Sequence, residues 1–233
     1  MNAGIAPQPG TLAPRLSSLS PAARRLWPEL GGTPEHFVLY GGTALGLRLG
    51  HRRSEDFDFF SSACIDPTAI LRETAYLEHA TVSDQDRRTL ICTVERGDPV
   101  QVSFFGGLAL NRVEDPDPIQ NPAIQVASLL DLAATKAQVV QVRASAKDYL
   151  DLDALVQRAG VSLDRALGAA AAVFGPGFNP LLTLKALSFF ADGSLPTVPE
   201  KVRNRLLGAV RATDPDRLPR FEHRKGLLPQ SVA

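Results

Sequence analysis

The sequence predicts an α+β protein in which a mixed β-sheet with flanking helices is followed by a C-terminal helical bundle. Three observations predict this order. Up to residue 105, short apolar runs typical of strands are interspersed with short helical patterns. A proline-rich segment, Asp115–Pro122, then interrupts both patterns. From Ser128 onward, apolar residues recur with the period of about 3.6 residues that is typical of helices.

Composition and charge are those of an ordinary globular protein. Of the 233 residues, 44% are hydrophobic and 21% charged, which allows a sizeable core and excludes a disordered chain. The 25 basic and 25 acidic residues cancel, so no global charge attracts the protein to nucleic acid. No signal-like segment opens the chain, and no apolar run approaches the ~20 residues of a membrane span. We therefore expect a cytoplasmic protein that does not enter a membrane.

The predicted domain boundary lies in the proline-rich segment. Its prolines are expected to continue neither a helix nor a strand, because proline lacks the backbone N–H that both structures use. This divides the chain into an αβ core, residues 1–120, and a helical domain, residues 121–233. Within the core, residues 1–19 are rich in Ala, Pro, Gly and Ser and predict a mobile or loosely packed leader.

The individual elements follow from apolar periodicity, N-caps and turn residues. The sheet is predicted to have about four or five strands, at residues 37–40, 56–60, around 82, 89–95 and 100–105. Core helices are predicted at 22–30, after Gly42, and from 66 to about 77. Five helices are expected in the second half, beginning near Ser128, running through Tyr149, and beginning at Ser162, Asn179 and Pro199.

Two carboxylates stand on one strand of the predicted sheet. Asp56 and Asp58 alternate with Phe57 and Phe59, so the two acids point to one face and the two aromatic rings to the core. Neighbouring carboxylates repel each other unless a cation lies between them, and hard oxygen ligands suit Mg²⁺ or Mn²⁺. The pair therefore predicts a divalent metal site.

A phosphate site is predicted just upstream. Gly41 and Gly42 allow a tight turn and a close approach to a ligand, Thr43 offers a hydroxyl, and the helix that starts here presents unpaired N–H groups to an anion. A Gly-Gly turn before a helix is weak evidence alone, because such turns are common for steric reasons. Together with the carboxylate pair, it predicts a site for a nucleoside triphosphate with its metal.

These residues resemble the signature of a known family. Gly41-Gly42-Thr43, followed by His51-Arg52, Ser54 and Asp56-Phe57-Asp58-Phe59-Phe60, is similar to the motifs of the AbiEii/AbiGii toxin family of nucleotidyltransferases, within the polymerase-beta-like nucleotidyltransferase superfamily. A second match includes Leu132, Lys136 and the run Lys147–Leu152. The resemblance spans roughly residues 36–158. It implies a nucleotidyltransferase-type mixed sheet followed by a helical bundle.

The resemblance also implies roles for single residues. Arg52, rather than Arg53, is expected to contact the triphosphate, since a guanidinium pairs with phosphate in a bidentate manner. By pattern alone Lys136 reads as a surface lysine, and only the resemblance makes it a residue that neutralises triphosphate charge. Asp148 is expected to position or deprotonate the acceptor hydroxyl. Lys147 and Asp151, one helical turn apart, read as an ordinary stabilising ion pair.

One position departs from the superfamily pattern. A third carboxylate is usual on a later strand, and in the strand Gln101–Phe105 the corresponding position is Ser103. A conventional site for two metal ions would then need Asp148 to reach in from the helical half.

The resulting hypothesis is a metal-dependent nucleotidyltransferase that moves a nucleoside monophosphate from an NTP to an acceptor. The resemblance suggests the toxin of a toxin–antitoxin or abortive-infection system, with a cognate antitoxin protein as partner and RNA, such as the tRNA 3′ end, as acceptor. Two alternatives stay open. One is a degenerate scaffold that acts by binding a partner, favoured by Ser103, and the other is an enzyme that modifies a small molecule such as an antibiotic.

Two further features are local. Residues 201–225 carry eight Lys or Arg against three Asp or Glu, an excess that would suit RNA. Cys64 and Cys92 have no metal-ligand spacing and are expected to be buried free thiols.

Overall fold

A computed structural model of the protein describes residues 11–229, which form two compact units. The first unit contains residues up to 108 together with 116–127, and the second contains 109–115 together with the chain from 128 onward. The chain therefore leaves the first unit at 109 and returns to it at 116. The predicted boundary at residue 120 falls within the returning segment.

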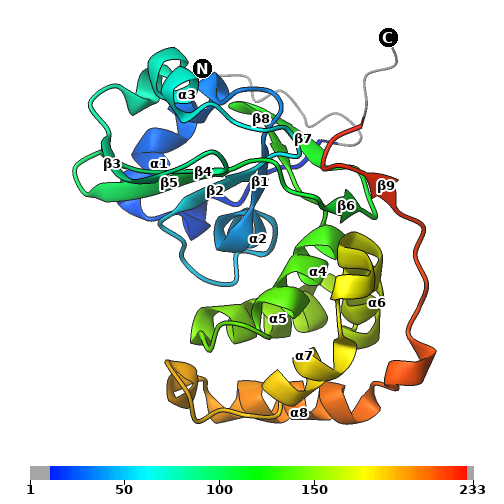
Figure 1. Ribbon diagram of the computed structural model, residues 1–233. Coiled ribbons are helices and arrows are strands. Elements are labelled where there is room, and N and C mark those ends of the chain that lie inside the picture. The colour runs from blue at the N-terminus through cyan, green and yellow to red at the C-terminus, as the bar shows by residue number, and fades with distance from the viewer. Residues whose placement is uncertain (1–10, 230–233) are drawn as a thin grey trace. The chain divides into compact units, whose positions relative to one another are not determined.

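The first unit is built on a seven-stranded mixed sheet (Figure 1). Its strands are β1 (Val38–Tyr40), β2 (Phe57–Phe60), β3 (Thr81–Gln85), β4 (Thr89–Glu95), β5 (Pro99–Phe105), β7 (Asp117–Gln120) and β8 (Ala123–Val126). Its helices are α1 (Pro21–Leu26), α2 (Gly41–Leu49) and α3 (Pro67–Glu73). The strand order is β3-β4-β5-β2-β1-β8-β7, in which β2–β5 and β1–β8 are parallel and the other pairs antiparallel.

The sheet is larger than predicted because the proline-rich segment forms strands. β7 and β8 make an antiparallel hairpin joined by Asn121 and Pro122, whose connecting peptide bond is cis. The expectation that these prolines exclude a strand is wrong. Pro118 lies in β7, which is an edge strand of the sheet, and an edge strand tolerates a residue without an N–H on its open side.

The predicted alternation in β2 is confirmed. Phe57 and Phe59 are completely buried, whereas Asp58 and Phe60 on the other face are partly exposed. The Phe59 ring stacks on Phe104 of β5 with ring centroids 5.6 Å apart. The aromatic side chains thus anchor β2 in the core, which fixes the face on which its carboxylate lies.

The part of the expected leader that the structure describes makes contacts with the rest of the first unit. Residues 1–10 lie outside the described range, but from residue 11 the chain contacts the first unit. The Arg15 N–H donates to the Leu47 carbonyl at 2.7 Å, and Ser18 accepts from the Ser54 N–H at 2.8 Å. Leu19 is buried. These are contacts between segments distant in sequence, so the local composition could not reveal them.

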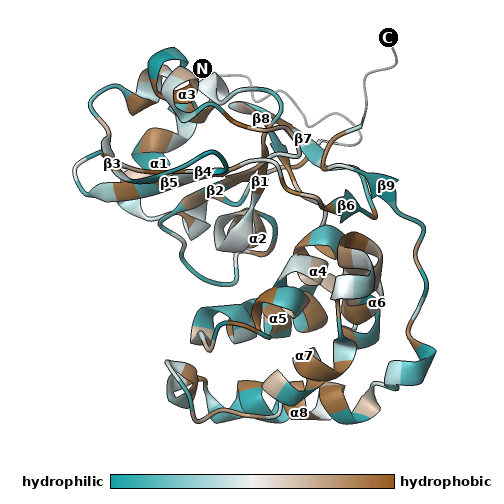
Figure 2. Cartoon of the chain, viewed as in Figure 1, coloured by the Kyte–Doolittle hydropathy of each residue, from teal (hydrophilic) through white to brown (hydrophobic). Residues whose placement is uncertain are grey.

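The second unit contains the five predicted helices. They are α4 (Leu129–Val139), α5 (Ala146–Ala159), α6 (Leu163–Phe174), α7 (Pro180–Ala186) and α8 (Glu200–Ala212). Figure 2 shows hydrophilic and hydrophobic residues alternating along α5 and α8, as expected of helices with one apolar face. The unit also contains a short antiparallel pair, β6 (Asn111–Arg112) with β9 (Arg224–Lys225), which the sequence did not predict.

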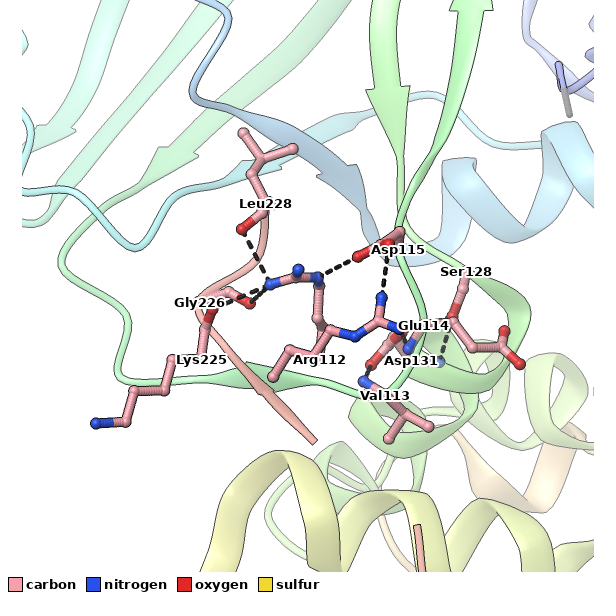
Figure 3. Close-up of polar contacts among 10 residues, drawn as sticks. Arg112, Val113, Glu114, Asp115, Ser128, Asp131, Lys225, Gly226 and Leu228 are labelled. Carbon is pink, nitrogen blue, oxygen red and sulfur yellow. Dashed lines mark hydrogen bonds and ion pairs between the residues drawn. The ribbon is translucent and has the colours of Figure 1, made fainter. Parts of the chain in front are cut away.

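Arg112 joins the β6 segment to the C-terminal segment (Figure 3). Its side chain is buried, and its Nε donates to Asp115 at 2.7 Å. Its Nη1 lies 2.9–3.1 Å from the carbonyl oxygens of Lys225, Gly226 and Leu228. One buried guanidinium therefore holds together residues more than a hundred positions apart in the sequence.

Asp131 organises the start of α4 beside this network (Figure 3). Its buried carboxylate accepts from the N–H groups of Val113 and Glu114 at 2.8 and 3.1 Å and from the Ser128 hydroxyl at 2.6 Å. Ser128 is also the N-cap of α4, at the position where the helical period was predicted to begin. Burial raises the pKa of Asp131, and these three hydrogen bonds oppose that rise.

The two cysteines differ in exposure. Cys92 is buried in β4, and this burial raises the pKa of its thiol to about 11. Cys64 is exposed, so the expectation of a buried thiol is correct for Cys92 and wrong for Cys64. From residue 11 to residue 229, no helix is long and apolar enough to cross a membrane.

Candidate active site

The turn between β1 and α2 forms the centre of the candidate site in the first unit. Gly41 has a φ of 72°, a backbone conformation that favours glycine. A methyl group added at Gly41 would overlap the Asp58 carboxylate, and one added at Gly42 would overlap the Arg52 guanidinium. The absence of side chains at these two glycines therefore lets a carboxylate and a guanidinium lie directly against the start of α2. Four of the residues predicted from sequence come together here.

Asp58 lies in β2 and Asp56 directly precedes this strand. Asp56 is exposed, and Asp58 is partly exposed. Asp58 is in register with Tyr40 of β1 and with Ser103 of β5. The position at which a third carboxylate was expected from the resemblance is thus occupied by a buried serine next to Asp58.

Thr43 has a structural contact that the sequence did not predict. Its side chain is buried, and its Oγ1 lies 2.7 Å from the Ser54 Oγ and within hydrogen-bonding distance of the Asp56 carbonyl. The threonine therefore ties α2 to the loop that leads into β2. Its hydroxyl is engaged there, and its backbone N–H belongs to the first turn of α2, where such groups have no partner within the helix.

The donor set fits a hard divalent cation that arrives with a phosphate-bearing substrate. Asp56 and Asp58 supply carboxylate oxygens, and Mg²⁺ is commonly bound by one or two carboxylates together with substrate phosphates. No cluster of three or more His, Cys, Asp or Glu suited to a metal is found among residues 11–229. The residues therefore fit Mg²⁺ or Mn²⁺ bound together with a triphosphate, and they do not form an all-protein metal cage.

The second unit contains the other two predicted site residues, Lys136 on α4 and Asp148 on α5. The Lys136 Nζ lies 2.7 Å from Asp148 Oδ1 and 2.7 Å from Asp151 Oδ2. All three side chains are buried, and both carboxylates are fully inaccessible. Lys136 is therefore not a surface lysine, although its sequence context alone suggests one.

The same cluster includes Arg143, which sequence reasoning missed. Its Nε donates to Asp148 Oδ2 and its Nη2 to Asp148 Oδ1, both at 2.9 Å, in a bidentate pair. Unlike its partners, the Arg143 side chain is 62% exposed. The sequence feature that could have indicated Arg143 is its place as a basic residue in the short connection between the two helices that carry Lys136 and Asp148.

The expected pair between Lys147 and Asp151 is replaced by a pair between Lys136 and Asp151. Asp148 and Asp151 are three residues apart, so both lie on the face of α5 that meets α4. Lys147 is exposed, and no ion pair of its side chain is found in the part of the chain that the structure describes. Packing between helices, and not spacing within one helix, selects the partner of Asp151.

Sequence comparison finds relatives of this chain. The sequence model of a family described as nucleotidyl transferase AbiEii toxin, type IV toxin–antitoxin system, matches residues 29–225. An uncharacterised protein of Aquifex aeolicus (strain VF5) is 35% identical over 134 residues, which are 57% of this chain. The match spans 63% of the length of that relative.

Two solved structures share the fold. A candidate nucleotidyltransferase from H. pylori superposes with a TM-score of 0.52 at 16% identity, over 81% of this chain and 90% of its own. The nucleotidyltransferase toxin MenT4 from Mycobacterium tuberculosis H37Rv superposes with a TM-score of 0.51 at 18% identity, over 82% of each chain. At these identities the likeness concerns the fold alone.

Proposed function

This chain belongs to the AbiEii nucleotidyltransferase toxin family, and on that premise we propose that it transfers a nucleoside monophosphate from an NTP to an acceptor and releases pyrophosphate. The observation that carries the proposal is the turn at Gly41 and Gly42. There the Asp58 carboxylate and the Arg52 guanidinium lie against the first turn of a helix. A metal-binding acid, a phosphate-binding cation and unpaired N–H groups are the parts that phosphoryl transfer requires.

In this proposal, each residue of the first unit has one task. Asp56 and Asp58 hold Mg²⁺, which when bound offsets negative charge on the triphosphate. Arg52 and the N–H groups of Gly42 and Thr43 bind phosphate oxygens and orient the triphosphate for in-line attack. The Thr43 side chain acts indirectly, through its contact with the loop that positions Asp56.

The residues of the second unit take supporting roles. Lys136 was expected to neutralise triphosphate charge, but its buried ammonium group is paired with two carboxylates, so the role proposed for it is to hold this cluster together. Asp148 was a candidate to position or deprotonate the acceptor. Its carboxylate is inaccessible and already accepts from Lys136 and Arg143, which favours a role in positioning these two side chains over proton abstraction from the acceptor.

We propose RNA, with the tRNA 3′ end as one candidate, as the acceptor, and the toxin half of a cytoplasmic toxin–antitoxin or abortive-infection pair as the biological role. The support for RNA is the excess of eight basic over three acidic residues between positions 201 and 225. The family description supports a cognate antitoxin as partner.

The test is to incubate the protein with each labelled NTP, Mg²⁺ and total RNA, and to look for a labelled RNA band. Asp58→Asn serves as the inactive control. Label transferred only to small molecules would contradict RNA as the acceptor. If NTP binds in the presence of metal but no pyrophosphate is released, the second candidate is favoured, a degenerate scaffold that binds a partner, for which Ser103 beside Asp58 is the supporting observation.

A further inference from the structure

We propose that Arg143 binds a phosphate group of the substrate, with Asp148 as the positioning residue that holds it. This inference rests on the proposed nucleotidyltransferase function and names a residue of the second unit that would bind its substrate. It starts from the contrast within one cluster: Lys136, Asp148 and Asp151 are buried, and Arg143 alone is largely exposed.

Arg143 supplies a second positive charge to the cluster. Asp148 and Asp151 are two carboxylates, and Lys136 supplies a single positive charge between them. A buried charge is costly unless it is paired, so stability favours a further cation beside Asp148. This preference explains why a cation pairs with Asp148. It does not explain why that cation is an exposed arginine.

The geometry leaves part of the guanidinium available. The edge formed by Nε and Nη2 is used by Asp148, so the Nη1 group and one further N–H point away from the carboxylate. No other partner of this guanidinium is found between residues 11 and 229. Its neighbours in the helix connection, Val142 and Ala144, are also exposed.

A guanidinium held in this way suits an anion. The bidentate pair to a fully buried carboxylate fixes the plane of the Arg143 head group, so little side-chain freedom remains to be lost on binding. Its free N–H groups match the spacing of phosphate oxygens. Asp148 then contributes to substrate binding although it touches no substrate, which explains how an inaccessible acid can matter for activity.

The phosphate can belong to the triphosphate or to the RNA backbone, because both present the same oxygen atoms. Two measurements distinguish them. The first is the dissociation constant of each NTP together with its KM and kcat in the labelling assay. The second is the binding of total tRNA as a function of salt concentration.

We expect Arg143→Gln to weaken binding of one of these probes about 10- to 100-fold, the range of a lost charge-assisted contact, with a smaller change in kcat. If the triphosphate is the ligand, the dissociation constant and KM of the NTP rise. If RNA is the ligand, tRNA affinity falls and its salt slope decreases by about one. Lys147→Gln removes an exposed charge four positions away and should leave every value unchanged.

Two further variants distinguish phosphate binding by Arg143 from a purely structural role of this residue. Arg143→Lys keeps the positive charge next to Asp148 but loses the planar guanidinium group. This variant should fold normally and bind the NTP or tRNA several-fold more weakly than wild type. Asp148→Asn should weaken binding of the same probe as Arg143→Gln does. The affinity of the double variant for that probe should be only slightly lower than that of either single variant.

Unchanged NTP and tRNA affinities in folded Arg143→Gln would overturn the inference, and if that variant does not fold, unchanged affinities in Arg143→Lys would do so. Failure of the proposed function looks different. In that case the wild-type protein itself labels no acceptor, while the NTP and tRNA binding measurements still decide the role of Arg143.

Discussion

Asp58 is the residue on which the proposed metal site can be tested most directly. It lies between two buried phenylalanines, which hold the strand regardless of the charge on its carboxylate. Asp58→Asn keeps the shape and removes one of two neighbouring negative charges. Without metal, the free energy of unfolding should stay within about 1 kcal/mol of wild type or rise slightly.

With Mg²⁺–NTP present, the same variant should lose the ligand-induced rise in melting temperature, because a ligand stabilises only the protein that binds it. Nucleotide incorporation should fall at least about a hundredfold. Glu55→Gln is the matched control, since Glu55 is an exposed acid just before the pair. A folded Asp58→Asn protein that still incorporates nucleotide would contradict the enzyme proposal.

At the scale of the element, the start of α2 depends on its two glycines for different reasons. Gly41→Ala forces a positive φ on alanine, which costs about 1–2 kcal/mol, and its methyl group displaces the Asp58 carboxylate. It should lower both the melting temperature and NTP binding. The methyl group of Gly42→Ala meets the guanidinium at the end of the long Arg52 side chain, which it would displace, so NTP binding should fall with little loss of stability.

Gly177→Ala is the control for both glycine variants. A methyl group there meets nothing within 4 Å, and its φ is not positive, so stability should change by less than about 0.5 kcal/mol. Thermal unfolding with and without Mg²⁺–NTP measures all three variants. Equal effects of Gly41→Ala and Gly177→Ala would contradict the role assigned to the turn.

The basic C-terminal segment divides into structural and available cations. Arg205 forms a bidentate pair with Asp153, and Arg203 donates to the Val198 carbonyl. Arg211 and Arg220 are exposed, and no hydrogen bond or ion pair of either side chain is found in the described chain. The net charge of the segment therefore overstates the number of side chains that can meet RNA.

If RNA binds this segment, Arg211→Gln with Arg220→Gln should lower the salt slope of RNA binding by about two, one for each lost phosphate contact. Arg205→Gln should instead reduce stability, because it leaves the mostly buried Asp153 without its partner. Filter binding across a salt series, with melting curves as the stability check, separates these effects. An unchanged slope in the double variant would exclude both arginines from the RNA site.

At the scale of the whole molecule, Arg112 connects segments that lie far apart in the chain. Arg112→Met leaves three carbonyl oxygens and Asp115 without their buried donor, which should cost at least about 3 kcal/mol of unfolding free energy. Arg224→Met removes an exposed partner of the same Asp115 and should cost no more than about 1 kcal/mol. Urea denaturation measures both variants, and equal losses would mean that the buried network adds nothing beyond a surface ion pair.

The sequence alone was sufficient to predict those features of the structure that depend on interactions between residues close together in the chain. The alternation in β2, the Gly-Gly turn before α2 and the helix starts near Ser20, Asp66 and Ser128 depend on residues within about four positions of one another. The residues of the candidate site in the first unit could be named in advance for the same reason. They all lie within one strand–helix–strand segment of the chain, from β1 to β2. The side-chain contacts of Thr43 were not predicted.

Only the tertiary structure decided which distant residues become neighbours. Strand order brings Ser103 beside Asp58, makes an edge strand of a proline-containing segment, and pairs β9 with β6. Helix packing buries Lys136 and makes it, in place of Lys147, the ion-pair partner of Asp151. The same packing pairs Arg143 with Asp148. No local pattern predicts such pairs, because their energies come from excluding water between segments that the chain brings together only on folding.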